Sequence, residues 1–309
     1  MNKHTGGHPT AVEPVQSLWS GYGEIVRVHL SNASAASVIV KWVEPPHNMH
    51  HPRGWSGKAS HNRKLKSYRV EQCFYSDWIP SYTASHRTAQ CHVAEPTEHG
   101  WRFLLEDLDA AGYARRCMSL NSSQLDNCLR WLASFHAHFL NHKPTGLWKV
   151  GTYWHLATRK HELKALKDPQ LRAAAQTLDA TLNNCRFRTL VHGDAKVANF
   201  CFGQNDVAAV DFQYVGGGCG IKDVAYLLSS CLTDGECETQ APQHLDTYFR
   251  YLHHHFAADV DGQAVEQEWR SLYPAAWADF HRFLAGWAPD HWKIHRYTRR
   301  MTAVALADS

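Results

Sequence analysis

The chain has 309 residues, 44% of them hydrophobic, which is enough for two domains or one large two-lobed domain with a substantial core. Its 32 Lys and Arg residues against 29 Asp and Glu residues leave a net charge of only +3. Because no long run of like charge occurs, an extended surface for nucleic acid or membrane is not expected, whereas a small anionic ligand is compatible with this balance.

Nine scattered cysteines form no C-x-x-C pair, which favours reduced thiols over a disulfide framework. The segment 1–14 lacks the apolar core of a signal peptide, and no apolar run approaches the ~20 residues that span a bilayer. We therefore expect a soluble, cytoplasmic protein. The 23 histidines accompany no zinc-binding motif, so a dedicated zinc site is not expected.

The first predicted elements are two β-branched runs, residues 24–30 and 37–43, joined by the small-residue loop 31–36. This pattern predicts a hairpin. Small side chains such as that of Ser34 let backbone N–H groups approach a phosphate, although a G-x-G-x-x-G is absent. A plain surface turn is the alternative.

Lys41 lies within the second apolar run and needs either a partner or an edge position at which it can snorkel. Residues 44–64 are rich in Pro, His and Gly and predict an exposed insertion. The helical spacing of residues 63–78 then places Glu71 in mid-helix. Glu71 is available to pair with Lys41, unless it is an ordinary solvated helix glutamate.

A second hairpin is predicted from residues 90–94 and 101–106, after which strands give way to helices. This change predicts a boundary between a lobe of residues 1–107 and a lobe of residues 108–309. The second lobe is predicted to be mainly helical, with helices from a cap at Asn121 or Ser122, at 154–167, at 170–184, from Asp223 onward and over most of 242–305.

The most informative stretch is Leu190-Val-His-Gly-Asp-Ala-Lys-Val-Ala-Asn-Phe, followed by Val210-Asp-Phe. In-line phosphoryl transfer needs a group for the hydroxyl proton, cation ligands and positive charge. Asp194 suits the first task, Asn199 and Asp211 are hard oxygen ligands for Mg2+, and Lys196 can reach the transferring phosphate. The alternative is a loop in which these side chains make only turn hydrogen bonds.

His192, between Val191 and Gly193, is predicted to support this loop as a buried hydrogen-bonding side chain rather than to act as a base. The pattern His192-Gly-Asp-x-x-x-x-Asn199 with Asp211-Phe and Asp223-x-Ala-Tyr-Leu resembles the small-molecule branch of the protein-kinase-like fold. That branch includes aminoglycoside phosphotransferases, choline kinases and the ecdysteroid-kinase-like group. The last is favoured by Gln213 in place of glycine and by the run Leu132-Ala-Ser-Phe-His136-Ala.

The resemblance covers residues 20–290 and implies an α+β, bilobal fold with a small β-rich N-terminal nucleotide-binding lobe, containing one main helix, and a larger, mainly helical, catalytic and substrate-binding lobe. It also implies binding of ATP and Mg2+. For the nucleotide, the resemblance implies that Lys41, paired with Glu71, binds the phosphates, that residues 31–36 cover them, and that backbone groups of Glu106 and Leu108 bind adenine. For the reaction, it implies that Asp194 is the catalytic base and that Asn199 and Asp211 bind the metal. Asp223 would connect its helix to the catalytic loop.

Gly193 stands where protein kinases carry the arginine that reads a phosphorylated activation loop, so neither that regulation nor a protein substrate is expected. We expect an ATP- and Mg2+-dependent kinase acting on the hydroxyl of a small molecule. Few clustered acids and 12 tryptophans favour an apolar or choline-like alcohol over an aminoglycoside, although any single tryptophan is better explained as filling a helical core. The alternative is a nucleotide-binding pseudokinase or scaffold, and the oligomeric state stays open.

Overall fold

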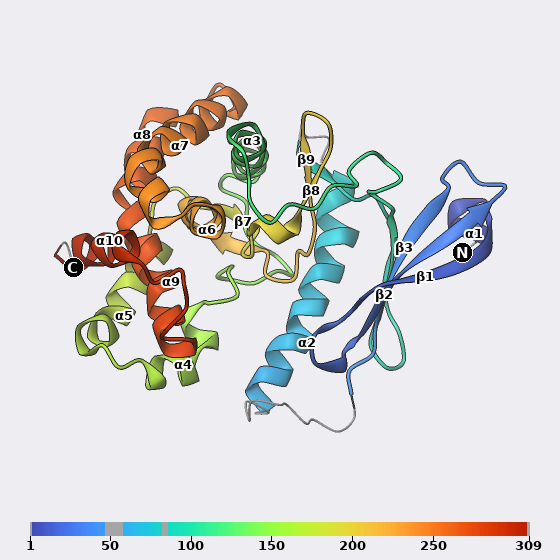
Figure 1. The fold of residues 1–309 in the computed structure, drawn as a ribbon, viewed down its shortest axis with the longest axis horizontal. Helices are drawn as coiled ribbons and strands as arrows, with labels where there is room; N and C mark the ends of the chain where they lie inside the picture. The colour runs from blue at the N-terminus through green and yellow to red at the C-terminus, as the bar shows by residue number, and fades with distance from the viewer. Residues whose placement is uncertain (1, 47–57, 82–85, 308–309) are drawn as a thin grey trace. The chain divides into compact units, whose positions relative to one another are not determined.

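The computed structural model describes residues 2–46, 58–81 and 86–307. Contacts between residues divide the chain into two compact units (Figure 1). The first holds the described residues of Met1–Thr83, Arg87–Arg116 and Cys201–Gln213. The second holds those of Ala84–His86, Cys117–Phe200 and Tyr214–Ser309. The functional division predicted for residues 1–107 and 108–309 stays a prediction.

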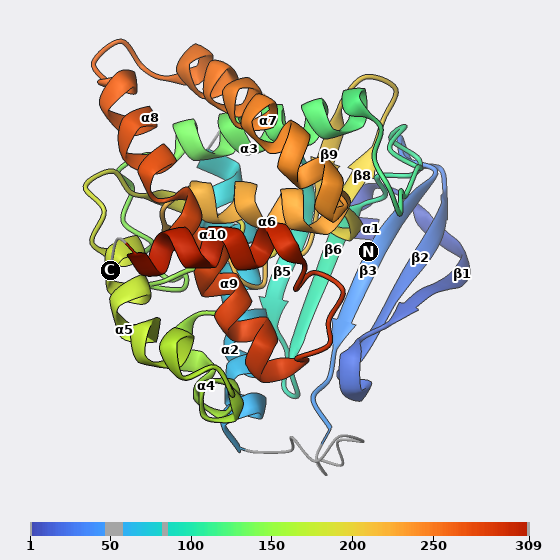
Figure 2. The same ribbon diagram turned by 60° about the vertical axis from the view of Figure 1, so that its left-hand side comes forward.

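The first unit contains a five-stranded antiparallel sheet of order β1-β2-β3-β6-β5 (Figure 2). Its strands are β1 (His8–Ser17), β2 (Gly23–Ser31), β3 (Ser37–Val43), β5 (Cys91–Pro96) and β6 (Trp101–Glu106). Both predicted hairpins are confirmed. β1 was not predicted from the sequence, because its prolines and polar side chains hide the alternating pattern of a strand. It is an exposed edge strand, and its pairing with β2 shifts register after Pro9 and after Pro14.

β3 lies between β2 and β6, with Lys41 opposite Ile25 on one side and Phe103 on the other. Lys41 is therefore in a central strand, which excludes the edge-strand alternative. Val28, Val38 and Leu104 form a small apolar core in the same sheet.

The helix α2 (Lys58–Cys73) continues into a π-type turn, Phe74–Trp78, and a short 3-10 turn, Ile79–Ser81. It packs on β5 and β6. The predicted insertion over 44–64 is thus wrong for residues 58–64, which are helical, and its part at 47–57 lies outside the described residues. The predicted helix at 63–78 is confirmed, with an earlier start.

Three short strands form a separate sheet of order β4-β9-β8. These are β4 (Arg87–Thr88), β9 (Val207–Ala209) and β8 (Phe200–Phe202), with β4 parallel to β9. The remaining short elements are α1 (Asn2–Thr5), a 3-10 turn at Trp19–Gly21 and, in the second unit, 3-10 turns at Leu156–Thr158 and Val197–Asn199. Asp211, a predicted site residue, follows two residues after the end of β9.

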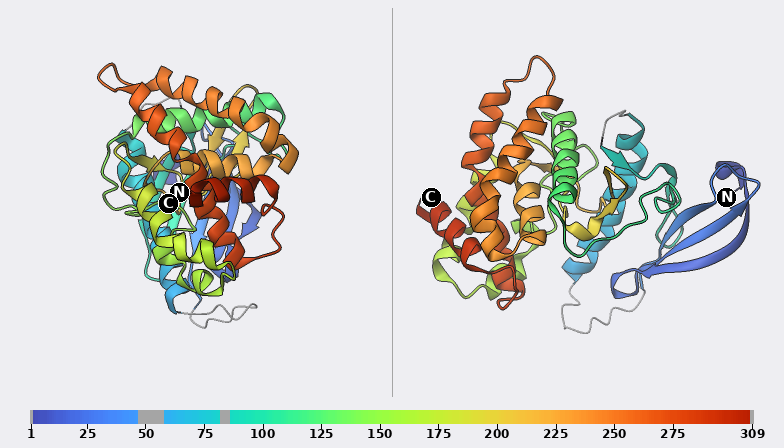
Figure 3. Two further views of the ribbon diagram at one scale, coloured as in Figure 1. Left: turned by 90° about the vertical axis from the view of Figure 1, so that its left-hand side faces the viewer. Right: turned by 45° about the horizontal axis from the view of Figure 1, so that its top comes forward.

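The second unit is mainly helical (Figure 3). Its helices are α3 (Ser122–His138), α4 (Lys160–Ala165), α5 (Pro169–Asn183), α6 (Ile221–Cys231), α7 (Asp234–His255), α8 (Gly262–Ser271), α9 (Tyr273–Trp287) and α10 (Arg296–Ala307). Asn121 caps α3 as predicted, in a capping box with Gln124. The last helical region starts at Asp234 rather than Pro242, because a capping box between Thr233 and Glu236 begins α7 and Pro242 lies within it.

A two-stranded ladder, β7 (Thr189–Val191) with β10 (Gly216–Gly218), is embedded in this helical unit. Around Trp154, the side chains of Tyr226, Phe280 and Phe283 form an aromatic core. Trp154, Trp269 and Trp277 are each at most 1% exposed, so these tryptophans fill the interior. The predicted α+β fold, with a β-rich first part and a helical second part, is confirmed. Within the described residues, every helix is too short or too polar to cross a bilayer.

Candidate active site

The predicted pair of Lys41 and Glu71 is present in the first unit. Lys41 Nζ donates to Glu71 Oε1 at 2.9 Å and to Oε2 at 2.6 Å. Both residues are buried, and a broken pair would leave an uncompensated charge in a poorly solvated place. Burial raises the pKa of Glu71, the Lys41 ammonium opposes this, and the negative charge of Asp211 raises it further. The two carboxylates thus concentrate negative charge, which a bound cation would relieve.

The segment Asp211-Phe-Gln holds α2 in the position that this pair requires. The ring of Phe212 stacks on Phe74, one turn beyond Glu71, with centroids 4.4 Å apart. Gln213 Oε1 accepts hydrogen bonds from Lys64 Nζ at 2.8 Å and Ser67 Oγ at 3.2 Å. The glutamine that replaces glycine therefore ties this segment to the helix.

Asp211 adopts a left-handed backbone conformation, with φ of 67°. Aspartate tolerates this region better than most residues other than glycine, because its short side chain can bond locally. Such outliers concentrate at functional sites. The role of Asp211 as a metal ligand stays a prediction.

The predicted adenine-binding segment lies just after β6. Leu108 O accepts from Tyr113 N at 2.8 Å, whereas the N–H of Leu108 has no hydrogen-bond acceptor within the described part of the chain. Glu106 N donates to Gln90 O at 2.8 Å, and its carboxylate accepts from Arg87 and from Gln90 N. An N–H without a protein acceptor is free to donate to a ligand, so Leu108 suits its predicted role.

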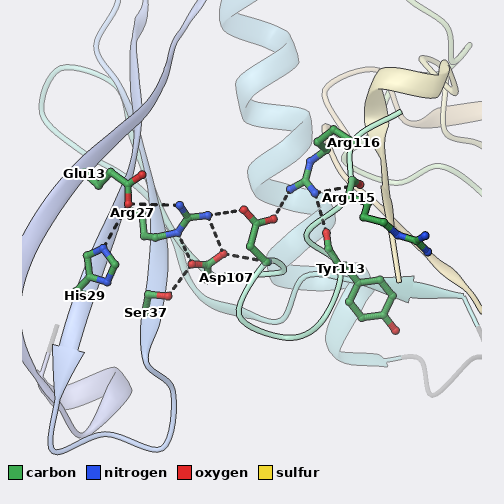
Figure 4. A network of polar contacts seen from close by, with 9 residues as sticks. Glu13, Arg27, His29, Ser37, Asp107, Tyr113, Arg115 and Arg116 are labelled. Atoms are coloured by element: carbon green, nitrogen blue, oxygen red, sulfur yellow. Dashed lines mark hydrogen bonds and ion pairs between the residues drawn. The ribbon is translucent and has the colours of Figure 1, made fainter. Parts of the chain in front are cut away.

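A charged network fixes the backbone between these two residues (Figure 4). Asp107 Oδ2 accepts from Arg27 Nε on β2 and from Ser37 Oγ on β3, each at 2.6 Å. Arg27 also donates to Asp109 Oδ2 at 2.5 Å, and Arg116 donates to Asp109 Oδ1 at 2.8 Å. The segment after β6 is thereby attached to the two strands that carry the predicted phosphate loop.

In that loop, Ser34 is exposed at the tip of the β2–β3 hairpin. The hairpin closes through Leu30 N, which donates to Ala36 O at 2.9 Å. The phosphate-covering role of 31–36 stays a prediction.

In the second unit, Asp223 organises the loop that carries Asp194. From the first turn of α6, its carboxylate accepts from His192 N at 2.5 Å and Gly193 N at 3.0 Å. His136 Nε2 lies 3.2 Å from Asp223 Oδ2, and Tyr248 Oη lies 2.8 Å from His136 Nδ1. Since an ionised carboxylate only accepts, His136 donates through Nε2. The predicted structural tie by Asp223 is confirmed.

Gly193 and His192 complete the support of this loop. Gly193 has φ of 79°, and a Cβ there would lie 2.2 Å from Tyr214 O, so only glycine fits. His192 is fully buried, and its Nδ1 accepts from Asp194 N at 3.3 Å. The predicted supporting role of His192 is confirmed.

The structure brings Asp194, Lys196 and Asn199 together. Asp194 Oδ2 accepts from Lys196 Nζ at 3.0 Å and from Asn199 Nδ2 at 3.1 Å. Asn199 Nδ2 also donates to Asp194 O at 2.8 Å, which leaves its Oδ1 as an acceptor. This arrangement places a carboxylate and an amide oxygen side by side, and the catalytic and metal-binding roles of these residues stay predictions.

Tyr226 is a site residue that the sequence analysis missed. Its hydroxyl donates to Asp194 Oδ1 at 3.1 Å and approaches Tyr153 Oη at 3.3 Å. Burial, with the nearby Asp194 charge, raises the pKa of Tyr226 well above its ordinary value, so it stays a donor. The signal was available, because Tyr226 follows Asp223 by three residues on a predicted helix.

Lys293, in the loop between α9 and α10, is a second residue that was missed. Its Nζ lies 4.8 Å from the centre of the Tyr226 ring, and the residue is 8% exposed. Burial lowers the pKa of Lys293 to about 8, while Asp194 raises it and Lys196 lowers it further. No local motif marks Lys293, since only tertiary folding places it here.

The donor set suits a magnesium ion better than a transition metal. Among the residues that the structure describes, no group of three or more His, Cys, Asp or Glu side chains is placed to hold a metal. Mg2+ needs only one or two protein oxygen ligands, because phosphate oxygens and water complete its shell. Asn199 and Asp211 are of the right chemical type, and they belong to different units.

A family model described as the phosphotransferase enzyme family matches residues 88–260, more than half of the chain. The chain belongs to this family. Thus the motif around Asp194 lies within the matched part of a phosphotransferase. No functionally curated protein matches its sequence.

Several solved structures resemble this phosphotransferase in fold. A putative aminoglycoside phosphotransferase from Ralstonia eutropha has a TM-score of 0.52 at 12% identity, covering 99% of this chain and 93% of that one. A choline kinase from Cryptosporidium parvum has a TM-score of 0.52 at 10% identity, covering 96% and 88%. An amicoumacin kinase in complex with AMP-PNP and Ca2+ has a TM-score of 0.50 at 15% identity, covering 96% and 87%. At such identities the likeness shows the protein-kinase-like fold alone.

Proposed function

We propose that this phosphotransferase is an ATP- and Mg2+-dependent kinase that transfers the γ-phosphoryl group to a hydroxyl of a small molecule. The observation that carries the proposal is the environment of Asp194, whose carboxylate is held by Tyr226, Lys196 and Asn199. A carboxylate oriented in this way, beside a lysine, suits alignment and deprotonation of an alcohol.

The remaining predicted residues would bind the nucleotide and the metal. Lys41, oriented by Glu71, would bind phosphate oxygens, with Ser34 and its loop above them, and backbone groups of Glu106 and Leu108 would bind adenine. Asn199 and Asp211 would hold Mg2+, which when bound supplies positive charge to the phosphate oxygens.

Transfer itself requires little covalent chemistry from the chain. Asp194 would accept the proton of the acceptor hydroxyl as the oxygen attacks phosphorus. Lys196, 3.0 Å from the same carboxylate, would stabilise charge on the transferring group. Tyr226, still protonated, would keep Asp194 oriented during this step.

The acceptor is proposed to be an uncharged or singly charged alcohol, in a cytoplasmic protein related to the ecdysteroid-kinase-like group. A polycationic aminoglycoside is disfavoured because the carboxylate at the site is accompanied by Lys196 and Lys293. A choline-like cation is less well supported as the acceptor, because Trp154, Trp269 and Trp277 are buried in the core and cannot form an aromatic cage around it. The pseudokinase alternative rests on the glycine-free loop 31–36.

Purified protein with Mg-ATP and a broad panel of hydroxyl compounds tests the proposal. Asp194→Asn is expected to lower kcat about 10²- to 10⁴-fold while Mg-ATP still raises the melting temperature. Asp259→Asn, which alters an exposed aspartate distant in sequence from the motif, is the matched control. Stabilisation by Mg-ATP without transfer to any acceptor would instead establish the pseudokinase, and absence of both would reject nucleotide binding.

A further inference from the structure

Lys293 is a buried lysine whose close side-chain contacts are aromatic, and the charges of Asp194 and Lys196 also act on it. Its Nζ lies 4.8 Å from the ring centre of Tyr226 and 5.5 Å from those of Phe280 and Trp292. Cation–π contacts recover part of the lost hydration of an ammonium, but they do not neutralise its charge. In the described ranges of the chain, no carboxylate lies within 4.0 Å of this Nζ.

Two other buried cations of the second unit, Lys222 and Arg282, each have a carboxylate partner. Lys222 Nζ lies 3.9 Å from Asp279, and Arg282 donates to Asp279 at 2.7 Å. Because an isolated buried charge is expensive, proteins generally pair it or use it. Lys293 departs from this rule within the same unit.

The position of Lys293 connects it to the reacting groups. The Tyr226 ring that it covers donates through its hydroxyl to Asp194. Tyr226 therefore links the Lys293 ammonium to the predicted catalytic carboxylate of Asp194. Lys196 also donates a hydrogen bond to that carboxylate. Lys196 and Lys293 thus place two positive charges near the carboxylate of Asp194, an arrangement that can attract an anionic group.

We infer that Lys293 is a specificity-determining residue that binds an anionic oxygen group of the acceptor, which makes the substrate a hydroxylated acid rather than a cationic or purely apolar alcohol. This inference rests on the proposed function for the identity of the reacting hydroxyl. Because Lys293 lies over the ring of Tyr226 and the hydroxyl of Tyr226 bonds to Asp194, we place the anionic group close to the reacting hydroxyl. A quaternary ammonium at the same place would be repelled.

Matched sets of acceptors test the inference by binding as well as by turnover. Each set contains a hydroxycarboxylate, its neutral amide, its phosphate-bearing counterpart and a hydroxylated amine of similar size. Binding is measured by calorimetry and turnover by ADP release, on the full chain with Mg-ATP or AMP-PNP. Lys293→Met removes the charge at similar length, Lys293→Arg keeps it, and Lys164→Met alters an exposed lysine on α4 as a control.

Wild-type protein is expected to bind an acid at least tenfold more tightly than its amide. Lys293→Met should remove that preference while changing affinity for the amide less than twofold, and Lys293→Arg should retain most of it. The carboxylate and phosphate members show which anion is preferred. Because the substitution removes a charge without a carboxylate partner, Lys293→Met should also leave the melting temperature equal or higher, which establishes that the variant folds.

Three results would overturn the inference. These are equal affinity of the wild type for acid and amide, tighter binding of the amine, or an equal loss of kcat on all acceptors in Lys293→Met, which would assign Lys293 to the transferring phosphoryl group. If acids bind through Lys293 but no acceptor is phosphorylated, the inference stands and the proposed kinase activity fails. The two ideas therefore fail separately.

Discussion

At the scale of single residues, Thr152 shows how the second unit accommodates strain beside the loop of Asp194. Thr152 has φ of 96° and is buried, and its Oγ1 has no hydrogen-bond partner in the described chain. A β-branched residue rarely adopts such a backbone. Its neighbour Tyr153 donates through N to Gly193 O at 3.1 Å, so the strained backbone anchors the loop.

We predict that Thr152→Gly raises the thermal unfolding midpoint. Relief of about 1–3 kcal/mol of strain and loss of an unpaired hydroxyl should exceed the ~0.5–1 kcal/mol entropic cost of glycine. Thr152→Ala is the control, because it removes the hydroxyl but keeps the strain and should therefore stabilise less. A lower midpoint for Thr152→Gly than for Thr152→Ala would show that the backbone at this position is relaxed.

Asp107 gives the first unit an acid-sensitive point. Burial alone would raise its pKa, but hydrogen bonds from Arg27 and Ser37 outweigh it and hold the pKa below the usual value. A carboxylate whose pKa is lower in the folded than in the unfolded protein stabilises the fold at pH values above its unfolded pKa of about 3.9. This stabilisation is lost as the pH falls through the folded pKa. The contribution should thus be complete at neutral pH and begin to be lost below about pH 4.

Asp107→Asn should destabilise the protein by about 1–2 kcal/mol at pH 7, because Arg27 loses a charge-assisted bond but keeps Asp109. The difference from wild type should shrink as pH falls through the depressed folded pKa of Asp107, where Asp107 itself becomes protonated. Urea unfolding at several pH values measures this. A difference independent of pH would assign the effect to packing instead of charge.

Contacts between residues were predictable wherever a motif fixed the spacing. Asp194, Asn199 and Asp223 lie in one short stretch and the helix after it, so their local contacts follow from sequence order. The pairing of Lys41 with Glu71 was predicted from the need of an apolar-strand lysine for a partner together with the family resemblance, since each residue is costly to bury without the other. Lys293 could not be found in this way, because a lysine in a loop between helices resembles any solvated lysine.

At the scale of elements, the position of α2 depends on the segment after β9. Phe212 stacks on Phe74 and meets Tyr75 edge-on at 5.8 Å, while Gln213 bonds to Lys64 and Ser67. The π-type turn at Phe74–Trp78 presents both aromatic rings at this junction. Such turns inside helices recur at functional sites.

Phe212→Ala is predicted to cost about 3–5 kcal/mol and to weaken nucleotide binding about tenfold or more, because α2 loses the ring that holds Glu71 against Lys41. Phe212→Leu, which keeps an apolar side chain, should lose less stability and less nucleotide affinity. Calorimetry with Mg-AMP-PNP and urea unfolding separate affinity from stability. Unchanged affinity in a destabilised Phe212→Ala protein would mean that the Lys41–Glu71 pair holds without this contact.

The elements that the sequence missed lack amphipathic patterning. β1 is exposed along its whole length, so no alternation of apolar residues marks it, and only pairing with β2 defines it. The first turns of α2 are polar and fall within a stretch rich in His and Gly. Hairpins with β-branched runs and helices with caps, by contrast, carry their signal locally.

At the scale of the whole molecule, the proposed function requires residues from both units to serve one ligand. Lys41, Glu71 and Asp211 belong to the first unit, whereas Asp194, Lys196 and Asn199 belong to the second. A ligand that binds only the folded form of a unit protects that unit from opening, and at a concentration of 100 Kd the effect is about 2.7 kcal/mol. Amide hydrogen exchange reports this effect for each unit separately.

We therefore predict that saturating Mg-AMP-PNP slows exchange up to about 100-fold in β2 and β3 and, in the same experiment, in the loop from His192 to Asn199. Lys41→Met should abolish protection in both places, because a single ligand confers it, whereas an independent second site would leave the loop protected. Omission of Mg2+ should reduce protection most at Asn199 and Asp211 if these residues hold the metal. Protection confined to the first unit would mean that the nucleotide does not reach Asp194, and the assignment of Asp194 as the catalytic base would then be lost even though ATP binds.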